Sequence, residues 1–344
     1  MQKPVLVIKL GTASITNAQG AISTNVIEKV AAGIAQLSAT YQIVLVSSGA
    51  VGSGKALIKN YKGTLTERKA AAAIGNPILV QLYQQYFAPY HIPVAQALCE
   101  RHHFSNRSQF LQLKETFKTF WKNGILPIVN ENDLVSNVEI KFSDNDELAT
   151  LIAVGFNANT MIICTSVGGF LDHQKKIIPL IEKIDAEVMG FVTSDKSSLG
   201  LGGMLSKLTF ARLAVGLGIQ VIICGLQSTA PFTDALSGNN GTTFTAQQSN
   251  LKARQKWLAS GSITLGNICV DKGAEKALAG RRSLLTVGIT GIKGKFLAGE
   301  VVQITNEAEK IIGVAKVKIT AALLLQQLLV KGVVAAHADD IVLF

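Results

Sequence analysis

The sequence has few charged residues and no long apolar run. Asp, Glu, Lys and Arg make up 16% of the 344 residues, whereas hydrophobic residues make up 48%. So apolar a composition excludes an intrinsically disordered chain and can supply a sizeable core. No stretch of about 18 apolar residues runs without a strongly polar break, which argues against a membrane-spanning helix.

Signals for secretion and for disulfide bonds are also missing. A short apolar run at the N-terminus is interrupted by Lys9 and has no small-residue cleavage site after it, so we expect no secretory signal. The four cysteines lie far apart, without the paired spacing of a disulfide framework or a zinc site: Cys99, Cys164, Cys224 and Cys269. We expect them to be buried apolar residues in a reducing compartment, and the cytoplasm is the predicted location.

A local run of basic charge is absent, although the chain as a whole is basic. Its 33 Lys and Arg against 23 Asp and Glu give a net charge of +10. Basic proteins often bind nucleic acid. Here no run of like charges marks a basic arm, and residues 261–344 carry 10 basic and 7 acidic residues, a balance of only +3. We interpret most of the excess as solvated surface.

The length predicts about two domains, and the pattern of the first 230 or so residues is typical of an α/β fold. Short runs rich in Val, Ile and Leu predict strands buried on both faces, and amphipathic stretches between them predict helices. The strands are expected at 5–10, 43–46, 93–97, 126–129, 161–164 and 220–224, and the helices at 25–37, 66–87, 105–122 and 144–156. Asp144 followed by Glu147 indicates a capping box. The alternation predicts a mostly parallel sheet covered on both sides.

The residue pattern of the sequence changes after Ser237. Residues 237–245 are rich in Gly, Asn and Thr and predict a loop, and 247–259 predict a helix. Ser260 to Ser262 form the candidate boundary between a first domain, 1–258, and a second, 261–344. In the second, short β-rich runs at 263–270, 284–289, 300–304 and 311–319 predict a small β-barrel.

Polar, Gly-rich segments follow several of the strands, where ligands bind in open α/β sheets. In the first, residues 7–14, Lys9 ends an apolar strand and so favours an anionic partner, while Gly11 lets backbone approach closely. The alternative is a lysine that snorkels from the strand end. The second segment, residues 47–54, can cradle a carboxylate or phosphate with backbone donors, or be a tight turn.

Two further segments concentrate polar groups. Residues 127–133, then 144–146 after a possible hairpin, suit an α-ammonium group, or Mg²⁺ held through oxygen ligands. Capping explains Asp144 but leaves Asn130, Asn132 and Asp133 without a role. Residues 199–207 form a Gly-rich loop that ends in Lys207 at a helix start, which can hold nucleotide phosphates or be a flexible turn.

Taken together, these segments resemble the amino acid kinase family, and most closely its branch that phosphorylates glutamate. The match runs in order through VIKLGTASIT, VSSGAVGSG, PIVNENDLVSNVEIKFSDNDELA and GLGGMLSK, and VDKGAEKAL, GKFLAGEVVQI and HADDIVLF are similar to a PUA domain. The resemblance implies an αβα sandwich with a C-terminal PUA-like domain. It implies ATP-dependent phosphorylation of the L-glutamate γ-carboxylate to γ-glutamyl 5-phosphate with Mg²⁺, the first step of proline biosynthesis. It also implies feedback inhibition by L-proline and a homo-oligomer, either a dimer or a tetramer.

The resemblance also assigns roles to residues. Lys9 and Lys207 would be catalytic by neutralising charge on the transferring phosphoryl group. Glutamate would bind to Ser48, Asp133 and Asn145, with its α-ammonium on Asp133. The γ-carboxylate is ionised at pH 7, so no general base is expected, and no protein residue is assigned to a metal. The residues assigned to ATP are Lys9, Thr165, Ser166, Leu201, Gly202, Gly203, Met204, Leu205, Ser206 and Lys207.

The sequence departs from the family pattern on the nucleotide side. Ser166 stands at the position of a family aspartate that would orient the catalytic lysines, and the loop after it is short. Leu201 and Leu205 stand where the family favours Thr and Ser. Either Asp172 or Asp146 could replace the missing carboxylate.

Several functions therefore remain open. The leading hypothesis is the glutamate-phosphorylating kinase, slow or with altered nucleotide binding. Its alternatives are a glutamate- or proline-sensing pseudokinase, a kinase for another small acid, and an RNA-binding protein acting through the PUA-like domain. The low local charge and the lack of an aromatic-rich basic stretch argue against RNA binding as the main role.

Overall fold

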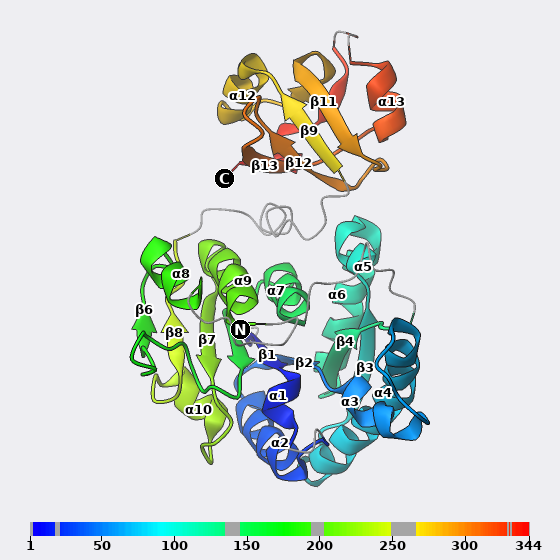
Figure 1. Ribbon diagram of the computed structural model, residues 1–344. Coiled ribbons are helices and arrows are strands. Elements are labelled where there is room, and N and C mark those ends of the chain that lie inside the picture. The colour runs from blue at the N-terminus through cyan, green and yellow to red at the C-terminus, as the bar shows by residue number, and fades with distance from the viewer. Residues whose placement is uncertain are drawn as a thin grey trace. The chain divides into compact units, whose positions relative to one another are not determined.

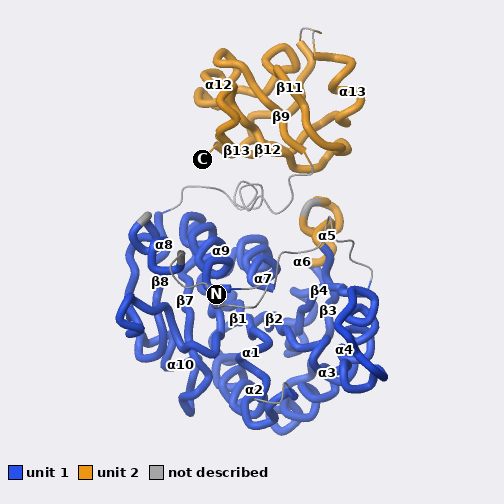
Figure 2. Tube along the Cα trace, viewed as in Figure 1, with its two compact units in different colours: residues 1–100, 114–249 blue, residues 101–113, 250–344 orange. Residues whose placement is uncertain are grey.

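The computed structural model (Figure 1) describes residues 3–17, 21–134, 145–193, 203–248, 266–328, 330 and 332–343, apart from the side chains of Ser105 and Ala186. The chain forms two compact units, coloured separately in Figure 2: residues 1–100 with 114–249, and residues 101–113 with 250–344. The predicted division between residues 258 and 261 falls outside the described residues. Residues 249–259 of the helix predicted at 247–259 also lie outside the described residues.

The first unit contains an eight-stranded sheet in the order β3-β4-β2-β1-β5-β7-β8-β6. Neighbouring strands are parallel except for the antiparallel pair β7 and β8. The predicted mostly parallel sheet is therefore confirmed. The strands are β1 Val5–Leu10, β2 Gln42–Ser47, β3 Val94–Cys99, β4 Leu126–Glu131, β5 Thr160–Cys164, β6 Leu180–Ile181, β7 Gln220–Cys224 and β8 Thr242–Phe244.

Two strand predictions are corrected. Residues 237–245 are not all loop, because β8 lies within them and pairs with β7. A strand of three residues is too short to show an apolar alternation in the sequence. β3 was expected to be buried on both faces, yet it is one of the two edge strands of the sheet, and several of its side chains are exposed or half-buried.

Three predicted helices, now α2, α4 and α7, are confirmed to within one residue at each end. Asp144 lies outside the described residues, so its capping role stays a prediction. The helix expected at 105–122 is α6, which ends where predicted and begins two residues later. A separate short helix, α5, ends at Ser105, and the Asn106 carboxamide oxygen accepts from the backbone N–H groups of Ser108 and Gln109 and so caps α6. The helices up to residue 248 are α1 Thr12–Ile15, α2 Thr24–Ser38, α3 Ala50–Gly54, α4 Leu65–Phe87, α5 Arg101–Ser105, α6 Arg107–Lys122, α7 Asn145–Gly155, α8 Ala186–Thr193, α9 Met204–Gly216 and α10 Pro231–Leu236, with 3₁₀ turns η1 Lys55–Leu57 and η2 Ala88–Tyr90.

Alternation along β1 decides which side chains meet which helices. Leu6, Ile8 and Leu10 lie in the core that includes residues of α2, α4 and α10. Successive side chains of a strand point to opposite faces, so Lys9 lies on the other face. There α7 packs on β1 and α9 packs on α7 and β7, and Figure 1 shows helices on both sides of the sheet. The buried cation at the end of β1 therefore points toward α7 and α9.

The second unit is rich in β-structure, as predicted. It has a five-stranded sheet, β11-β9-β12-β13-β15, and a two-stranded one, β10-β14. The strand expected at 284–289 is interrupted by a 3₁₀ turn, η3 Thr286–Gly288, in which the Thr286 hydroxyl donates to Val330 O. The elements are β9 Gly266–Val270, α12 Lys272–Ala279, β10 Leu284–Leu285, β11 Ile289–Gly294, β12 Val301–Thr305, β13 Ile311–Lys316, α13 Ala321–Gln326, β14 Val334–Ala336, η4 Ala338–Asp340 and β15 Ile341–Leu343.

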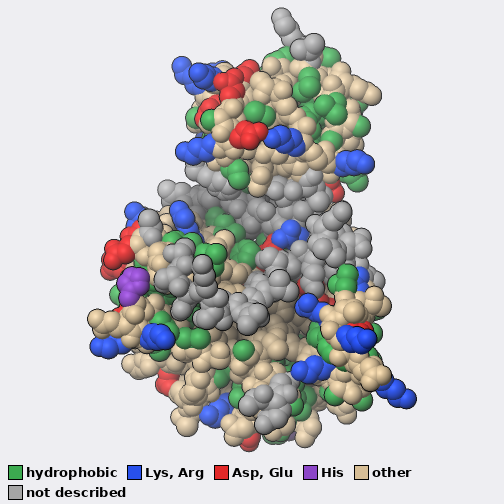
Figure 3. All heavy atoms as spheres, viewed as in Figure 1, with side chains coloured by type: hydrophobic (Ala, Val, Ile, Leu, Met, Phe, Trp, Pro, Cys, Tyr) green, Lys and Arg blue, Asp and Glu red, His purple; other side chains and the backbone are tan. Residues whose placement is uncertain are grey.

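The burial of the cysteines and the distribution of surface charge were also predicted from the sequence. Three cysteines are buried as expected, but Cys269 is only partly buried, which corrects that prediction. On the face drawn in Figure 3, Lys and Arg side chains are dispersed over both units. This agrees with the interpretation of the net charge as solvated surface. Of the helices described, none is long and apolar enough to cross a bilayer.

Candidate active site

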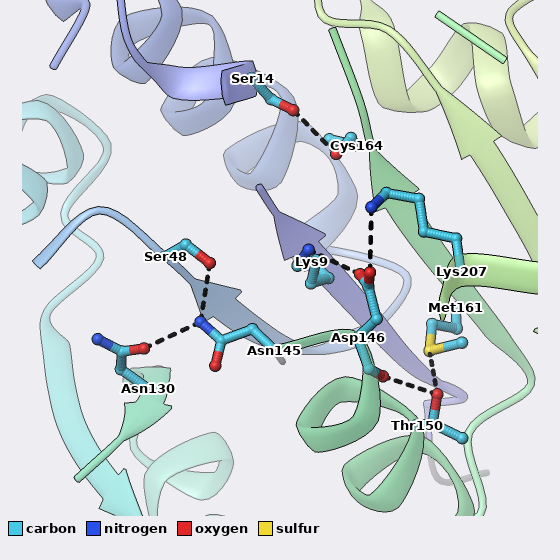
Figure 4. A network of polar contacts seen from close by, with 10 residues as sticks. All are labelled: Lys9, Ser14, Ser48, Asn130, Asn145, Asp146, Thr150, Met161, Cys164 and Lys207. Carbon is cyan, nitrogen blue, oxygen red and sulfur yellow. Dashed lines mark hydrogen bonds and ion pairs between the residues drawn. The ribbon is translucent and has the colours of Figure 1, made fainter. Parts of the chain in front are cut away.

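The start of α7 divides the site into two halves. Its first turn contains Asn145, Asp146 and Glu147, and acidic side chains are favourable there because of the helix dipole. Consecutive helical residues are rotated by about 100°, so Asn145 and Asp146 point to different sides. Figure 4 shows Asn145 turned toward Ser48 and Asn130, and Asp146 turned toward Lys9 and Lys207.

One half is a buried Lys–Asp–Lys group. Lys9 Nζ lies 2.6 Å from Asp146 Oδ1, and Lys207 Nζ donates to Asp146 Oδ2 at 3.1 Å. The exposed fractions of the three side chains are 6% for Lys9, 10% for Lys207 and 0% for Asp146. Two ammonium groups on one carboxylate leave the three residues with a net charge of +1. Buried charge is costly unless it is paired, so this group suits an anionic ligand.

Of the two carboxylates suggested as replacements for the family aspartate, Asp146 is the one that contacts the lysines. Asp146 holds both lysines, so they keep an orienting carboxylate although Ser166 follows β5 in place of an aspartate. Ser166 itself is exposed. The other suggested replacement, Asp172, instead closes a turn by accepting from the backbone N–H groups of Gln174 and Lys176.

The other half is a network of uncharged polar groups. Asn145 Nδ2 donates to Ser48 Oγ at 2.8 Å and to Asn130 Oδ1 at 3.0 Å. Asn130 Nδ2 in turn donates to Asn76 Oδ1 of α4 at 3.2 Å. Ser48 follows β2 and Asn130 lies in β4, so residues far apart in sequence meet at one edge of the sheet. The structure thus brings together Ser48 and Asn145, two of the three residues predicted to bind glutamate.

The third, Asp133, lies two residues beyond the end of β4 at the same edge and is half-buried. The strand end is held by its neighbour Asn132, whose backbone N–H donates to Cys99 O at 2.9 Å and whose side chain donates to Glu100 Oε1 at 2.9 Å. Asp133 therefore follows a segment tied to the end of β3.

Glycines lie in the turns that follow β1 and β2. A Cβ on Gly11 would lie 3.6 Å from Lys9 Nζ and 3.4 Å from Cys164 O. The nearby Ser14 hydroxyl donates to Cys164 O at 2.9 Å and so ties the turn after β1 to the end of β5. Gly49 has φ +110°, a left-handed conformation that glycine adopts without strain, so the turn after Ser48 requires glycine.

The predicted nucleotide residues lie on β5 and α9. Thr165 directly follows β5 and its backbone N–H donates to Cys224 O at 2.9 Å. α9 begins after Gly203, and its first turn carries Lys207 inward while Leu205 is exposed. Met204 and Ser206 belong to that turn, and the N-terminus of a helix suits phosphate oxygens. Leu201 and Gly202 lie outside the described residues.

Three buried polar residues were not among the site residues predicted from the sequence, although Asp146 had been suggested as a replacement for the family aspartate: Asn76, Asn130 and Asp146. Asp146 carried a usable signal, because it is the last acidic residue of the DND motif and falls within a predicted helix start. Asn130 lay in a segment already singled out. Asn76 is an amide on the buried face of a helix that is otherwise apolar there, and this contrast was visible only once the helix face was known.

The comparisons with known proteins agree with this geometry. Residues 4–225 match the model of the amino acid kinase family, and residues 266–326 match that of the PUA domain. The chain belongs to the amino acid kinase family. Its curated relatives include glutamate 5-kinases, such as that of Kosmotoga olearia, 36% identical over 324 residues that cover 92% of this chain and 89% of that protein. The glutamate 5-kinase of Aquifex aeolicus is 36% identical over 321 residues, covering 92% and 90%.

A solved structure supports the fold. The carbamate kinase of Giardia lamblia bound to AMP-PNP matches with a TM-score of 0.52 and 19% identity, over 71% of this chain and 99% of that one. At this identity the likeness shows the fold alone.

Proposed function

We propose that the chain transfers the γ-phosphoryl group of ATP to the γ-carboxylate of L-glutamate, giving ADP and γ-glutamyl 5-phosphate, the first step of proline biosynthesis. The relatives named glutamate 5-kinase support this over most of the chain. The observation that carries the proposal is the start of α7, where two adjacent residues hold different groups. Asp146 contacts the two lysines, and Asn145 contacts the uncharged Ser48. One suits the phosphoryl group and the other an amino acid acceptor.

In the phosphoryl half, catalysis is electrostatic. Phosphoryl transfer needs positioning and charge neutralisation more than covalent help from the protein. Lys9 and Lys207 would supply two ammonium groups that Asp146 holds in place before the reaction, so no reorganisation is needed as charge develops. The first turn of α9 would hold phosphate oxygens, with Thr165 and Ser166 as further nucleotide contacts. Leu201 and Gly202 keep their predicted nucleotide role.

Mg²⁺ belongs to the proposal as the partner of ATP, where it shields phosphate charge. It is commonly bound by one or two carboxylates together with substrate phosphates. Among the residues that the structure describes, no three His, Cys, Asp or Glu side chains gather as a metal site. The proposal assigns no protein residue to the ion.

In the acceptor half, the network sets the direction of hydrogen bonds. The Ser48 hydroxyl oxygen accepts from Asn145, so its own proton can be donated to a carboxylate oxygen of glutamate. Asn145 Oδ1 and the Asp133 carboxylate are acceptors that suit the α-ammonium group. The γ-carboxylate is ionised at neutral pH. Its oxygen attacks the γ-phosphorus, the bond to the β–γ bridging oxygen breaks, and ADP leaves without any proton transfer.

The test is ADP formation with and without L-glutamate, together with trapping of the acyl phosphate by hydroxylamine. The proposal expects ADP release that requires glutamate and one hydroxamate formed for each ADP. A protein that binds glutamate but never releases ADP would instead be the sensing pseudokinase. Purified protein with equal ADP release in both conditions would also overturn the proposal.

The resemblance extends the proposal beyond the site. We include a homo-oligomer, feedback inhibition by L-proline, a cytoplasmic location, and a division into a kinase domain, 1–258, and a PUA-like domain, 261–344. Addition of L-proline to the same assay tests the feedback directly, since it should lower the rate at subsaturating glutamate.

A further inference from the structure

α4 buries an amide next to the acceptor half of the site. Asn76 is 7% exposed and shares the buried face of α4 with apolar residues such as Ala72 and Leu79. A buried amide costs free energy unless it is hydrogen-bonded. Its oxygen accepts from Asn130 Nδ2 at 3.2 Å, so its partner is a member of the network described above.

The acceptor at Asn76 sets the direction of that network. A carboxamide has donors at one end and an acceptor at the other. Asn145 uses its NH₂ toward both Ser48 Oγ and Asn130 Oδ1, so Asn130 must turn its own NH₂ away from Asn145. Asn76 Oδ1 accepts a hydrogen bond from that NH₂ group of Asn130. A reversed Asn130 would place NH₂ against NH₂ at Asn145 and leave Asn76 Oδ1 without a donor from Asn130.

The backbone that carries Asn76 is held against the turn that carries Ser48. Gly75 lies so close to α3 that a Cβ would overlap Ala50 O, and a Cβ on Gly54 would overlap Ala71 O. Tyr83 is two turns further along α4, and its hydroxyl oxygen lies 2.7 Å from Ser47 Oγ. The Ser47 hydroxyl itself donates to Ser48 O at 2.9 Å. The Tyr83 hydroxyl is therefore the donor in this pair. Asn76 is thus a fixed reference point beside the turn.

We propose that Asn76 is a positioning residue for the amino acid acceptor. Through Asn130 it fixes the side-chain orientation of Asn145, and through Asn145 it leaves the Ser48 proton available for a carboxylate of the substrate. The inference rests on the proposed function, because it assigns that acceptor to the network. Lys9, Lys207 and Asp146 lie on the other side of the α7 start, so Asn76 acts on glutamate and not on ATP.

The test compares Asn76→Leu, which is nearly isosteric, with Asn76→Gln, which keeps an uncharged carboxamide, and uses Gln81→Ala at an exposed position of α4 as the matched control. Asn76→Leu removes the acceptor oxygen, and we expect the KM for glutamate to rise about tenfold, the effect of roughly one lost hydrogen bond in the binding state. The kcat and the KM for ATP should change less than about twofold. Asn76→Gln keeps an uncharged acceptor oxygen and should raise the glutamate KM clearly less than Asn76→Leu does. The control should match the wild type.

Two results overturn the inference. One is an equal rise in glutamate KM for Asn76→Leu and Asn76→Gln. The other is a lower kcat together with a rise in both KM values and a lowered melting temperature. If Asn76→Leu does not fold, Asn76→Ala replaces it in the same comparison. Wild-type protein without glutamate-dependent turnover would refute the proposed function instead. Calorimetric glutamate affinities of wild type and Asn76→Leu then decide the inference, and equal affinities would refute it.

Discussion

Replacing Asp146 by asparagine keeps the side-chain size and removes the charge that holds Lys9 and Lys207. Both ammonium groups lie within 3.1 Å of a carboxylate oxygen, and the carboxylate is fully buried. At about 3 Å and an effective dielectric constant of about 20, each attraction is roughly 5 kcal/mol before desolvation. Removing one partner of a buried ion pair typically costs about 3–5 kcal/mol, because the other charge stays buried. We expect the free energy of unfolding to fall by about 3 kcal/mol, since the amide oxygen still accepts from one lysine.

The same substitution should slow the chemical step without weakening ATP binding. An amide has one acceptor oxygen where the carboxylate has two, so one of the lysines loses its fixed position. Loss of one preorganised electrostatic group costs about 10²–10³ in kcat. The Lys–Asp–Lys group would change from a net charge of +1 to +2, so attraction for the triphosphate should not decrease. We therefore expect a lower kcat with an equal or lower KM for ATP.

Steady-state ADP release at saturating glutamate gives kcat and the KM for ATP, calorimetry gives ATP affinity, and urea unfolding gives stability. Asp172→Asn is the matched control, because that carboxylate accepts only backbone N–H groups of a turn in the contacts described above. The reasoning is refuted if Asp146→Asn keeps kcat within about threefold of the wild type. It is equally refuted if ATP affinity falls more than tenfold while kcat is unchanged.

Three further outcomes are expected. Lys207→Ala should lower kcat by about 10²-fold or more with little change in glutamate KM, since a fixed cation is lost; a change confined to glutamate KM in steady-state assays would contradict this. Asn145→Ala should raise the glutamate KM at least about tenfold and leave the KM for ATP nearly unchanged, and an equal rise in both would speak against two separate halves. Burial raises the pKa of Tyr83 above its ordinary value of about 10, so the stability it contributes is present below pH 10 and is lost as pH rises further. Urea unfolding at several pH values above 10 should therefore show that the free energy of unfolding falls less steeply with pH in Tyr83→Phe than in the wild type, by about 1.4 kcal/mol per pH unit. Identical slopes in the two proteins would contradict the pKa shift.

Much of the fold could be predicted from the sequence because buried parallel strands are continuous apolar runs. β1, β5 and β7 stand out in this way, and all three lie in the middle of the sheet. β3 and β8 were harder to predict for different reasons. β3 has the apolar composition of a central strand but only one neighbour, and β8 pairs three residues through contacts distant in the chain. The local composition of a strand does not show how many strands pair with it or which strands they are.

The site was predictable in its residue types but not in its internal contacts. Lys9 and Lys207 were identified because lysines at the ends of apolar and Gly-rich segments favour anions. The carboxylate that orients them is missing at Ser166, and the sequence left Asp172 and Asp146 as its possible replacements; the structure shows that it is Asp146. Finding it requires knowing that α7 packs on β1 and α9, and how its first turn is rotated about the helix axis. The same holds for Asn76, whose role depends on which face of α4 is buried.

Transfer of oxygen from glutamate to phosphate tests the central claim most directly. Glutamate labelled with ¹⁸O in both γ-carboxylate oxygens is incubated with ATP, Mg²⁺ and hydroxylamine, and the released inorganic phosphate is analysed by mass spectrometry. Attack by the carboxylate on the γ-phosphorus, followed by hydroxylamine at the carbonyl, leaves one ¹⁸O in each phosphate, in equal amount to the hydroxamate. Phosphate without ¹⁸O, released in the absence of hydroxamate, would mean that water rather than glutamate accepts the phosphoryl group and would contradict the account.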